Sequence, residues 1–191
     1  IDLISKKNFA KILIPILNDK FYKNIKSHQP NYILSEFIAA RSNKNGLHLH
    51  IDSWVPSSSN YCNMVQIVIP LDDRNKSNGC SVLVPGSHKS DQYVNRDIET
   101  SKIKNIVLNK SDMVIWDSRI WHGTRNFENN KSPWSIIITM QSWFLKQRFD
   151  FPKDLNKSIF KKLNNQQKTI IGYHSIPPKN SKASTIIRRG Y

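Results

Sequence analysis

The chain has 191 residues, a length that can bury a sizeable core and that is typical of a single domain. Its 29 lysine and arginine residues outnumber 14 aspartate and glutamate residues, which gives a formal net charge of +15. One dense basic face would favour a nucleic-acid partner, but the lysines are spread along the chain, so we expect no specific nucleic-acid binding.

The sequence argues against a membrane protein and against a disulfide-stabilised one. No run approaches the roughly 20 apolar residues that a membrane span needs. The two cysteines, Cys62 and Cys80, are too few for a disulfide framework or a zinc knuckle, which favours a reducing compartment. We therefore expect a soluble, cytoplasmic protein. Because the chain begins with Ile1 rather than methionine, we also expect that it is truncated at the N-terminus.

The hydrophobic pattern changes from helical to extended along the chain. Residues 5–28 have apolar positions at helical spacing, and Pro15 is predicted to end or start a helix within them. Seven short β-branched or aromatic runs then predict strands over residues 31–41, 47–54, 63–71, 80–86, 104–109, 112–118 and 134–144. Seven strands with little helical pattern between them favour an antiparallel sandwich or barrel.

The C-terminal part has a different composition. From about residue 152 the chain is basic and rich in asparagine and proline, which predicts a short helix followed by an irregular, extended tail. We interpret the whole chain, residues 1–191, as one domain with a barrel over about residues 30–150 and a tail over residues 152–191.

The run "LHLHIDSW" places two histidines and an aspartate at alternate positions. If residues 47–54 form a strand, His48, His50 and Asp52 share one face of it. A solvated outer face would also explain this pattern. A site for Fe(II) built from two histidines and one carboxylate needs a further, distant histidine on another strand. His122 in "WDSRIWHG" meets this requirement, 72 residues after His50.

Other histidines compete for the same role. His48 could replace His50 in an H-x-H pair, but Asp52 as the anionic ligand favours His50. His88 lies in the turn "PGSH", where a histidine commonly bonds to neighbouring backbone, so we do not expect it to bind metal.

Three motifs together carry a family resemblance: "HID" at residues 50–52, "NGCSVLVPGSH" at residues 78–88 and "DSRIWHG" at residues 117–123. In order and spacing they resemble the phytanoyl-CoA dioxygenase superfamily of Fe(II)/2-oxoglutarate-dependent oxygenases. The resemblance implies a mainly β, cupin-like jelly roll, or double-stranded β-helix, with a short N-terminal helical segment. It also implies Fe(II) held by His50, Asp52 and His122, 2-oxoglutarate as cosubstrate, O2, and hydroxylation of a small molecule.

The sequence departs from this family at one position. In the family, an arginine about eleven residues after the distal histidine pairs with the far carboxylate of 2-oxoglutarate, and a hydroxyl residue follows two positions later. Counting from His122 gives Pro133, so the arginine is missing, whereas Ser135 keeps the hydroxyl. In one interpretation a neighbouring cation replaces the arginine, either Lys131 or Arg125, with Arg119 as a third candidate. Lys131, Arg125 and Ser135 are the predicted cosubstrate-binding residues.

Two functions within this family therefore stay open, and a basic nucleic-acid-binding module is the alternative from another class. The first is an active non-haem Fe(II)/2-oxoglutarate-dependent dioxygenase, whose small-molecule substrate the excess of lysine and arginine would allow to be anionic. The second is a non-catalytic metal-binding relative that has lost the anchor for 2-oxoglutarate. The sequence does not define the oligomeric state.

Overall fold

The computed structural model describes residues 1–19, 26–95, 98, 100–128, 132–177 and 180. The chain divides into two compact units, one made of Ile1–Glu36 and Met140–Tyr191 and the other of Phe37–Thr139. Strands β1 (Tyr32–Arg41) and β8 (Trp134–Ser142) each contribute residues to both units. That the whole chain folds as one domain stays a prediction.

The first unit begins with helix α1 (Lys7–Leu17), which buries Phe9, Leu13 and Leu17 at helical spacing. Pro15 was expected to be a helix boundary, but the helix continues through it to Leu17. Pro15 is exposed and lies in the last turn, so the hydrogen bond that proline removes is lost next to solvent.

The C-terminal part of this unit contains more helix than the one short helix predicted. The described residues form α2 (Phe151–Asp154), α3 (Lys157–Phe160), α4 (Asn165–Ile170) and the 3-10 turn η3 (Tyr173–Ser175). Side chains of Asp150, Asn156 and Asn164 accept hydrogen bonds from the first turns of the three α-helices. The asparagine-rich composition that suggested an extended tail thus supplies helix N-caps.

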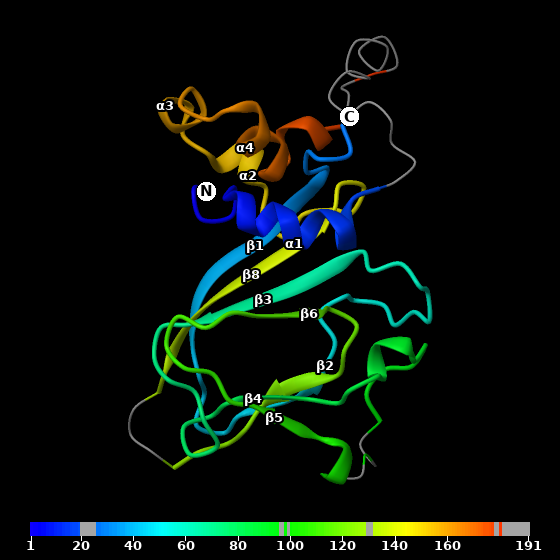
Figure 1. Ribbon diagram of the computed structural model, residues 1–191, viewed down its shortest axis with the longest axis vertical. Helices are drawn as coiled ribbons and strands as arrows, with labels where there is room; N and C mark the ends of the chain where they lie inside the picture. Colours follow the sequence, from blue (N-terminus) through cyan, green and yellow to red (C-terminus); the bar gives the residue numbers. More distant parts are fainter. Residues whose placement is uncertain (20–25, 96–97, 99, 129–131, 178–179, 181–191) are drawn as a thin grey trace. The chain divides into compact units, whose positions relative to one another are not determined.

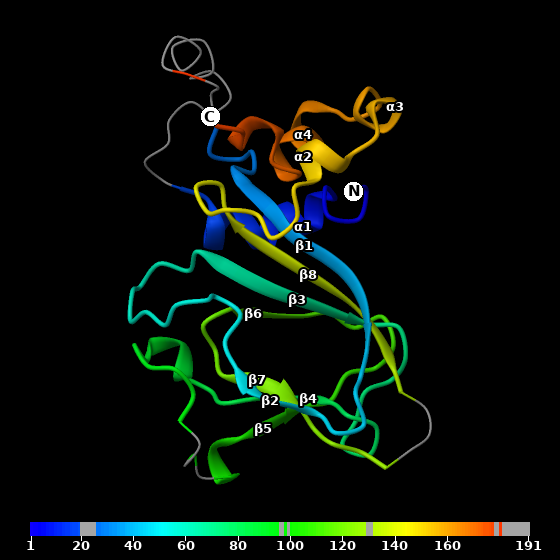
Figure 2. The ribbon, with the colours of Figure 1, turned by 180° about the vertical axis from the view of Figure 1, so that it is seen from behind.

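The remaining strands belong to the second unit. Together with β1 and β8, they form two antiparallel layers (Figures 1 and 2). The four-stranded sheets have the orders β1-β8-β3-β6 and β2-β7-β4-β5. The bounds are β2 (Leu47–His50), β3 (Met64–Pro70), β4 (Ser81–Leu83), β5 (Lys104–Ile106), β6 (Val114–Asp117) and β7 (His122–Thr124), with 3-10 turns η1 (Ser87–Lys89) and η2 (Thr100–Lys102). This mainly β, jelly-roll architecture confirms the predicted fold class.

The space between the two layers is filled by side chains from both. Trp116 of β6 pairs with Gln66 of β3 and packs in a buried cluster with Val68 and Ile120. Partly buried side chains from β4, β6 and β8 pack against this cluster, namely Leu83, Val114 and Ile137. Contacts from strands of both sheets therefore define the interior of the jelly roll.

Two predicted strands differ from the observed ones in a way that matters for the site. The strand expected over residues 47–54 ends at His50, so Asp52 is outside it. His122 was expected at the end of an apolar strand, but β6 ends at Asp117 and His122 begins a separate short strand, β7, which pairs with both β2 and β4. Three residues are too few for a periodic pattern, and tertiary pairing determines this strand.

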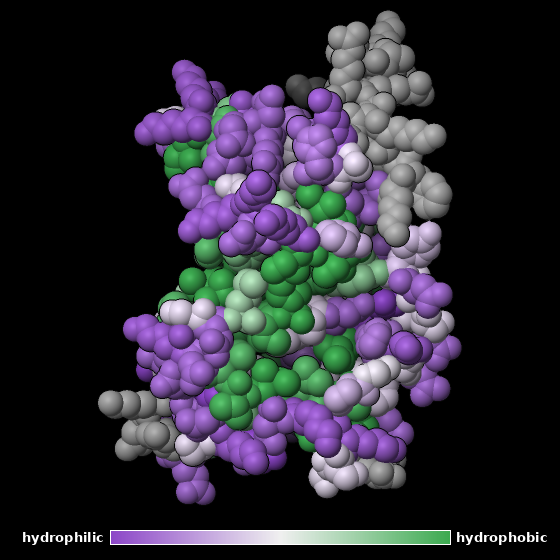
Figure 3. Space-filling model, viewed as in Figure 1, coloured by the Kyte–Doolittle hydropathy of each residue, from purple (hydrophilic) through white to green (hydrophobic). Residues whose placement is uncertain are grey.

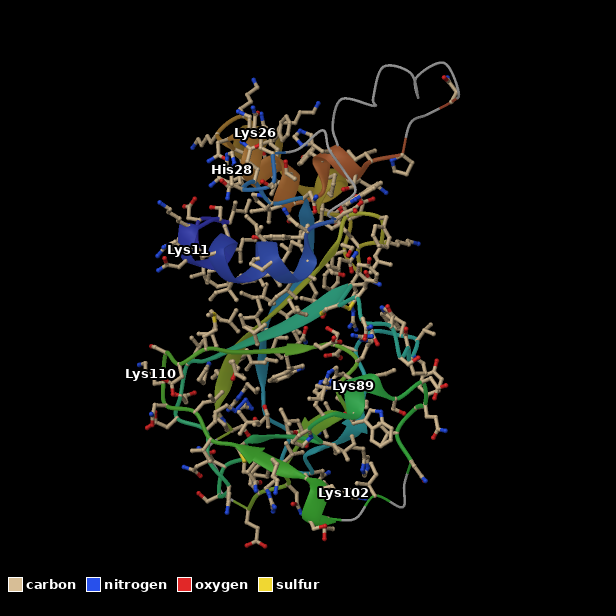
Figure 4. All side chains as sticks on the ribbon, turned by 45° about the vertical axis from the view of Figure 1, so that its right-hand side comes forward. Lys11, Lys26, His28, Lys89, Lys102 and Lys110 are labelled. Atoms are coloured by element: carbon tan, nitrogen blue, oxygen red, sulfur yellow. The ribbon has the colours of Figure 1, made fainter. Side chains whose placement is uncertain are left out.

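The surface shows a mixture of apolar and basic regions. Apolar side chains gather over the strands of the β1-β8-β3-β6 sheet in the view of Figure 3. In the second unit, Lys89, Lys102 and Lys110 point outward from separate loops and turns (Figure 4), rather than forming one basic face. Within the described residues, no helix is both long enough and apolar enough to cross a membrane.

Candidate metal centre

Two neighbouring strands bring His50 and His122 together. His50 is the last residue of β2, His122 is the first residue of β7, and the two residues are paired across the antiparallel register. Asp52 is positioned differently from the sequence-based expectation. Its backbone N–H donates to the carbonyl of Ser118 at 2.9 Å, and this bond, not strand alternation, turns the carboxylate toward the two histidines.

The three side chains converge on one point. One potential ligand atom from each of His50, Asp52 and His122 lies within 4.8 Å of the others. Nε2 of His50 is 3.5 Å from Oδ1 of Asp52, and Nε2 of His122 is 3.2 Å from Oδ2 of the same carboxylate. The two imidazole rings are 4.3 Å apart between centroids.

Backbone carbonyls orient both imidazole rings. Nδ1 of His50 donates to the carbonyl of His48 at 2.9 Å, and Nδ1 of His122 donates to the carbonyl of Ile120 at 3.0 Å. Since a carbonyl can only accept, each Nδ1 carries the proton, and each Nε2 lone pair can face a cation. Metal-binding histidines in proteins are commonly held by such a bond on the opposite ring nitrogen.

The charges at the site suit a cation. Burial alone would raise the pKa of Asp52, but the two imidazoles beside it favour the charged form and hold that pKa well below its ordinary value. Protonation of His50 would place a hydrogen on Nε2 facing Asp52, and this bond raises the pKa of His50 against the opposing effect of burial. In the neutral rings Nε2 carries no hydrogen, so the 3.2 Å contact of His122 with the buried Oδ2 of Asp52 is not a hydrogen bond, and Oδ2 has no hydrogen-bond partner among the described residues. A divalent ion bound by all three residues would satisfy this atom, so the residues fit the metal that the motif implies.

The surroundings hold His122 in place. Its ring lies 5.2 Å from the ring of buried Trp116 between centroids. The preceding residue, Trp121, donates its backbone N–H to Oγ of Ser87 at 2.8 Å and accepts at its carbonyl from the N–H of Val84 at 2.9 Å. Ser87 of the "PGSH" turn and the neighbouring Val84 therefore fix the backbone immediately before His122.

The structure places the competing histidines away from this point. The side chain of His48 is exposed, and His48 contributes its carbonyl rather than its ring. His88 lies in the turn η1 and is not part of the cluster.

The predicted cosubstrate-binding residues are scattered. Arg125 is exposed and donates from Nε to the side-chain oxygen of Asn105 on β5. Lys131 lies outside the described residues. Ser135 is buried on β8 with 1% exposure, and its hydroxyl accepts a hydrogen bond from Arg74 at 2.9 Å.

Sequence reasoning did not single out Arg74. It lies three residues after the strand predicted over residues 63–71 and among the polar residues of "DDRNKSNG", where an arginine is ordinarily a solvated loop residue. The only signal was indirect: a hydroxyl at position 135 without the arginine that the family resemblance implies requires another cation, and the structure supplies one from a segment 61 residues away.

With the fold and the convergence of the three side chains described, comparison with known proteins defines the class. Residues 2–133 match the model of the phytanoyl-CoA dioxygenase (PhyH) family, and the chain belongs to this family.

The similar proteins are distant in sequence. Two uncharacterized proteins, from Mycobacterium bovis and Mycobacterium tuberculosis, are each 23% identical over 120 residues, which is 61% of this chain and 43% of theirs. The chain thus spans less than half the length of these curated relatives.

Solved structures share the fold. HygX from Streptomyces hygroscopicus with nickel and 2-oxoglutarate bound has a TM-score of 0.60 at 18% identity, over 76% of this chain and 66% of HygX. The iron-bound form of HygX has a TM-score of 0.59 at 17% identity, over 76% of this chain and 68% of HygX. AviO1 from Streptomyces viridochromogenes has a TM-score of 0.50 at 19% identity, over 73% of this chain and 59% of AviO1.

Proposed function

We propose that this chain is a non-haem Fe(II)/2-oxoglutarate-dependent oxygenase that hydroxylates a small molecule. The observation that carries the proposal is the convergence of His50, Asp52 and His122, with a buried carboxylate oxygen that lacks a hydrogen-bond partner among the described residues. Membership of the phytanoyl-CoA dioxygenase family and the shared fold with HygX, which binds iron and 2-oxoglutarate, support it.

Each residue of the centre has a distinct part. His50 and His122 offer neutral Nε2 donors from paired strands, and Asp52 offers one negative charge. Three ligands on one side of an octahedral ion leave three positions open for a chelating cosubstrate and O2. Fe(II) bound there would couple the decarboxylation of 2-oxoglutarate to succinate with oxidation of the substrate by O2. The backbone bonds at both Nδ1 atoms fix the rings before the ion arrives.

The substrate class follows from the comparison and from the surface. HygX has been solved with hygromycin B bound. We expect a small-molecule substrate here as well, and the net charge of +15 would favour an anionic one. We also propose that the protein acts in the cytoplasm and without a specific nucleic-acid partner.

An anaerobic titration followed by a turnover assay tests the function. The purified chain should bind one Fe(II), and addition of 2-oxoglutarate should produce a metal-to-ligand charge-transfer band. With O2 admitted, succinate should form, and His50→Ala should abolish both iron binding and succinate formation. Iron binding without any band or succinate would instead identify a metal-binding relative without oxygenase activity, and failure to bind iron would refute the proposal.

A further inference from the structure

Arg74 is a buried cation at the end of β3. The residue is 5% exposed, and its backbone forms an isolated bridge with Leu108, with N–H to carbonyl distances of 2.7 and 2.9 Å. Its guanidinium Nη1 donates to Oγ of Ser135 on β8, and Nη2 donates to Oγ of Ser42, which follows β1. Two separate segments therefore hold the side chain of Arg74, and a third holds its backbone.

The charge of Arg74 has no anionic partner in the described part of the chain. No ion pair within 4.0 Å joins its guanidinium to a carboxylate there, and its buried Nε has no hydrogen-bond acceptor. Asp72 is near enough to favour the charged form, but its Oδ2 accepts from the backbone N–H of Trp134 at 2.8 Å. Burial lowers the pKa of Arg74, yet a guanidinium stays protonated in proteins. Two neutral hydroxyls compensate a buried charge poorly.

Arg119, in the same unit, is an arginine whose guanidinium is fully paired within the protein. Its Nε and Nη2 donate to the two carboxylate oxygens of Asp117 at 3.0 and 2.7 Å, and its Nη1 donates to the carbonyl of Ser57 at 3.1 Å. Every nitrogen of that guanidinium is used within the protein. By contrast, Nε of Arg74 has no acceptor and its charge has no anionic partner in the described part of the chain, so both can interact with a bound ligand.

Arg74 lies on the interior side of β8. Residues at alternate positions of a strand share one face, so Ser135 and Ile137 point to the same side. Ile137 packs against the buried cluster that contains Trp116, whose ring contacts His122. Ser135, which accepts from the guanidinium, therefore faces the same interior as the cluster that contacts His122.

We propose that Arg74 binds the far carboxylate of 2-oxoglutarate, with the hydroxyl of Ser135 as its partner. This inference rests on the proposed function and assigns the cosubstrate anchor within that site. The planar guanidinium matches a carboxylate through paired hydrogen bonds, and Nε together with one Nη is the fork that the described contacts leave least occupied. The Ser135 oxygen accepts from Arg74, so its own hydrogen can be donated to the same carboxylate.

This assignment explains the proline at position 133. Pro133 is buried on the same side of the chain as Ser135, and its carbonyl accepts from the N–H of Ser42 at 3.1 Å. A second guanidinium at position 133 would meet that of Arg74. In this chain the positive charge comes from the segment after β3, and β8 keeps only the hydroxyl.

Two cosubstrates that differ only at the far end give the sharpest test. 2-Oxoglutarate and 2-oxopentanoate have the same chelating end, but the second carries a methyl group in place of the far carboxylate. Both are titrated into the anaerobic Fe(II) protein, with the charge-transfer band as readout. The wild type should bind 2-oxoglutarate at least roughly 30-fold more tightly, because a buried charge pair is lost with the analogue. In Arg74→Met this preference should disappear, while the affinity for 2-oxopentanoate stays the same.

A matched variant and a rescue keep the result interpretable. Arg125→Met removes an exposed arginine that bonds Asn105, and it should leave the preference unchanged. Arg74→Met should keep or raise the melting temperature of the metal-free protein, because it removes an uncompensated buried charge; an arginine with a structural role would lower it. The double variant Arg74→Met/Pro133→Arg should regain a preference for 2-oxoglutarate.

The outcomes separate this inference from the proposed function. Iron binding and succinate formation with an unchanged preference in Arg74→Met would overturn the role of Arg74 and leave the oxygenase intact. If Arg74→Met does not fold, a wild type that binds both cosubstrates equally, or an Arg74→Lys variant with wild-type affinity and preference, would also overturn it. Absence of iron binding would refute the oxygenase itself and the anchor with it.

Discussion

Gly123 should control the spacing of the two histidine ligands. It follows His122 in β7, and a Cβ atom at this position would lie 2.3 Å from the carbonyl oxygen of Leu47 in β2. Ordinary van der Waals contact begins near 3.4 Å, so in Gly123→Ala the backbone of β2 would have to withdraw by about 1 Å. His50 lies on that strand and would move with it.

Gly123→Ala should lower both the metal affinity and the stability of the metal-free protein. Metal–ligand distances must be kept to within about 0.2 Å, and a shift of about 1 Å exceeds this several-fold. We expect the Fe(II) affinity of Gly123→Ala to fall by about 100-fold, the upper end of what is typical when support of a metal ligand is lost. Overpacking at one site costs about 1–3 kcal/mol of unfolding free energy, so most molecules should remain folded.

The assay combines thermal unfolding of the metal-free protein with an anaerobic Fe(II) titration. Gly172→Ala is the matched control, because Gly172 has φ +89° and its Cβ would contact the side chain of Gln147, outside the unit that holds the metal ligands. That variant should be destabilised to a similar extent with unchanged Fe(II) affinity. A Gly123→Ala protein that binds Fe(II) within about threefold of the wild type would refute the reasoning, since the ligands would then tolerate the movement of β2.

Three further outcomes are expected. His48→Ala should retain Fe(II) binding because only its carbonyl supports His50, whereas His50→Ala should lose it in the same titration. For the metal-free protein, the lowered pKa of Asp52 adds stability that is lost as pH falls below about 4, and the raised pKa of His50 adds stability that is lost as pH rises above about 6.5. The melting temperature should therefore exceed that of Asp52→Asn most clearly between these pH values, and a constant difference from pH 3 to 9 would contradict the assignment. Binding to duplex DNA should be weak at physiological salt and should weaken further with added salt; tight binding that survives His50→Ala would reverse the order of the proposed functions.

The three residues proposed as metal ligands could be singled out because their signal is local. An H-x-D pattern near a strand and one later histidine beside a glycine are visible in the sequence, and the structure brings those three residues together. The reason given for Asp52 was nevertheless wrong. Strand alternation was expected to place it beside His50, but β2 ends at His50 and a backbone bond to Ser118 positions the aspartate.

The elements that were missed depend on contacts between distant segments. β7 has three residues and no periodicity, so only its pairing with β2 and β4 reveals it. The short C-terminal helices were hidden by asparagines that are typical of loops and equally typical of N-caps. Arg74 meets Ser42 and Ser135 only because β1, β3 and β8 are neighbours in one sheet, and no pattern along the chain encodes that proximity.

The two halves of the proposed cosubstrate site belong to different sheets, and this accounts for the uncompensated charge. The two proposed histidine ligands lie on β2 and β7 of one sheet, whereas Ser135 lies on β8 of the other sheet and Arg74 lies in the segment that follows β3 of that sheet. A carboxylate side chain placed opposite Arg74 would satisfy the guanidinium permanently and would occupy the interior that the cosubstrate needs. Leaving Arg74 without an anion costs stability in the free protein, but the same desolvated charge then favours a dicarboxylate over a monocarboxylate. Under this proposal, selective binding of a dicarboxylate depends on leaving the charge of Arg74 without an anionic partner in the free protein.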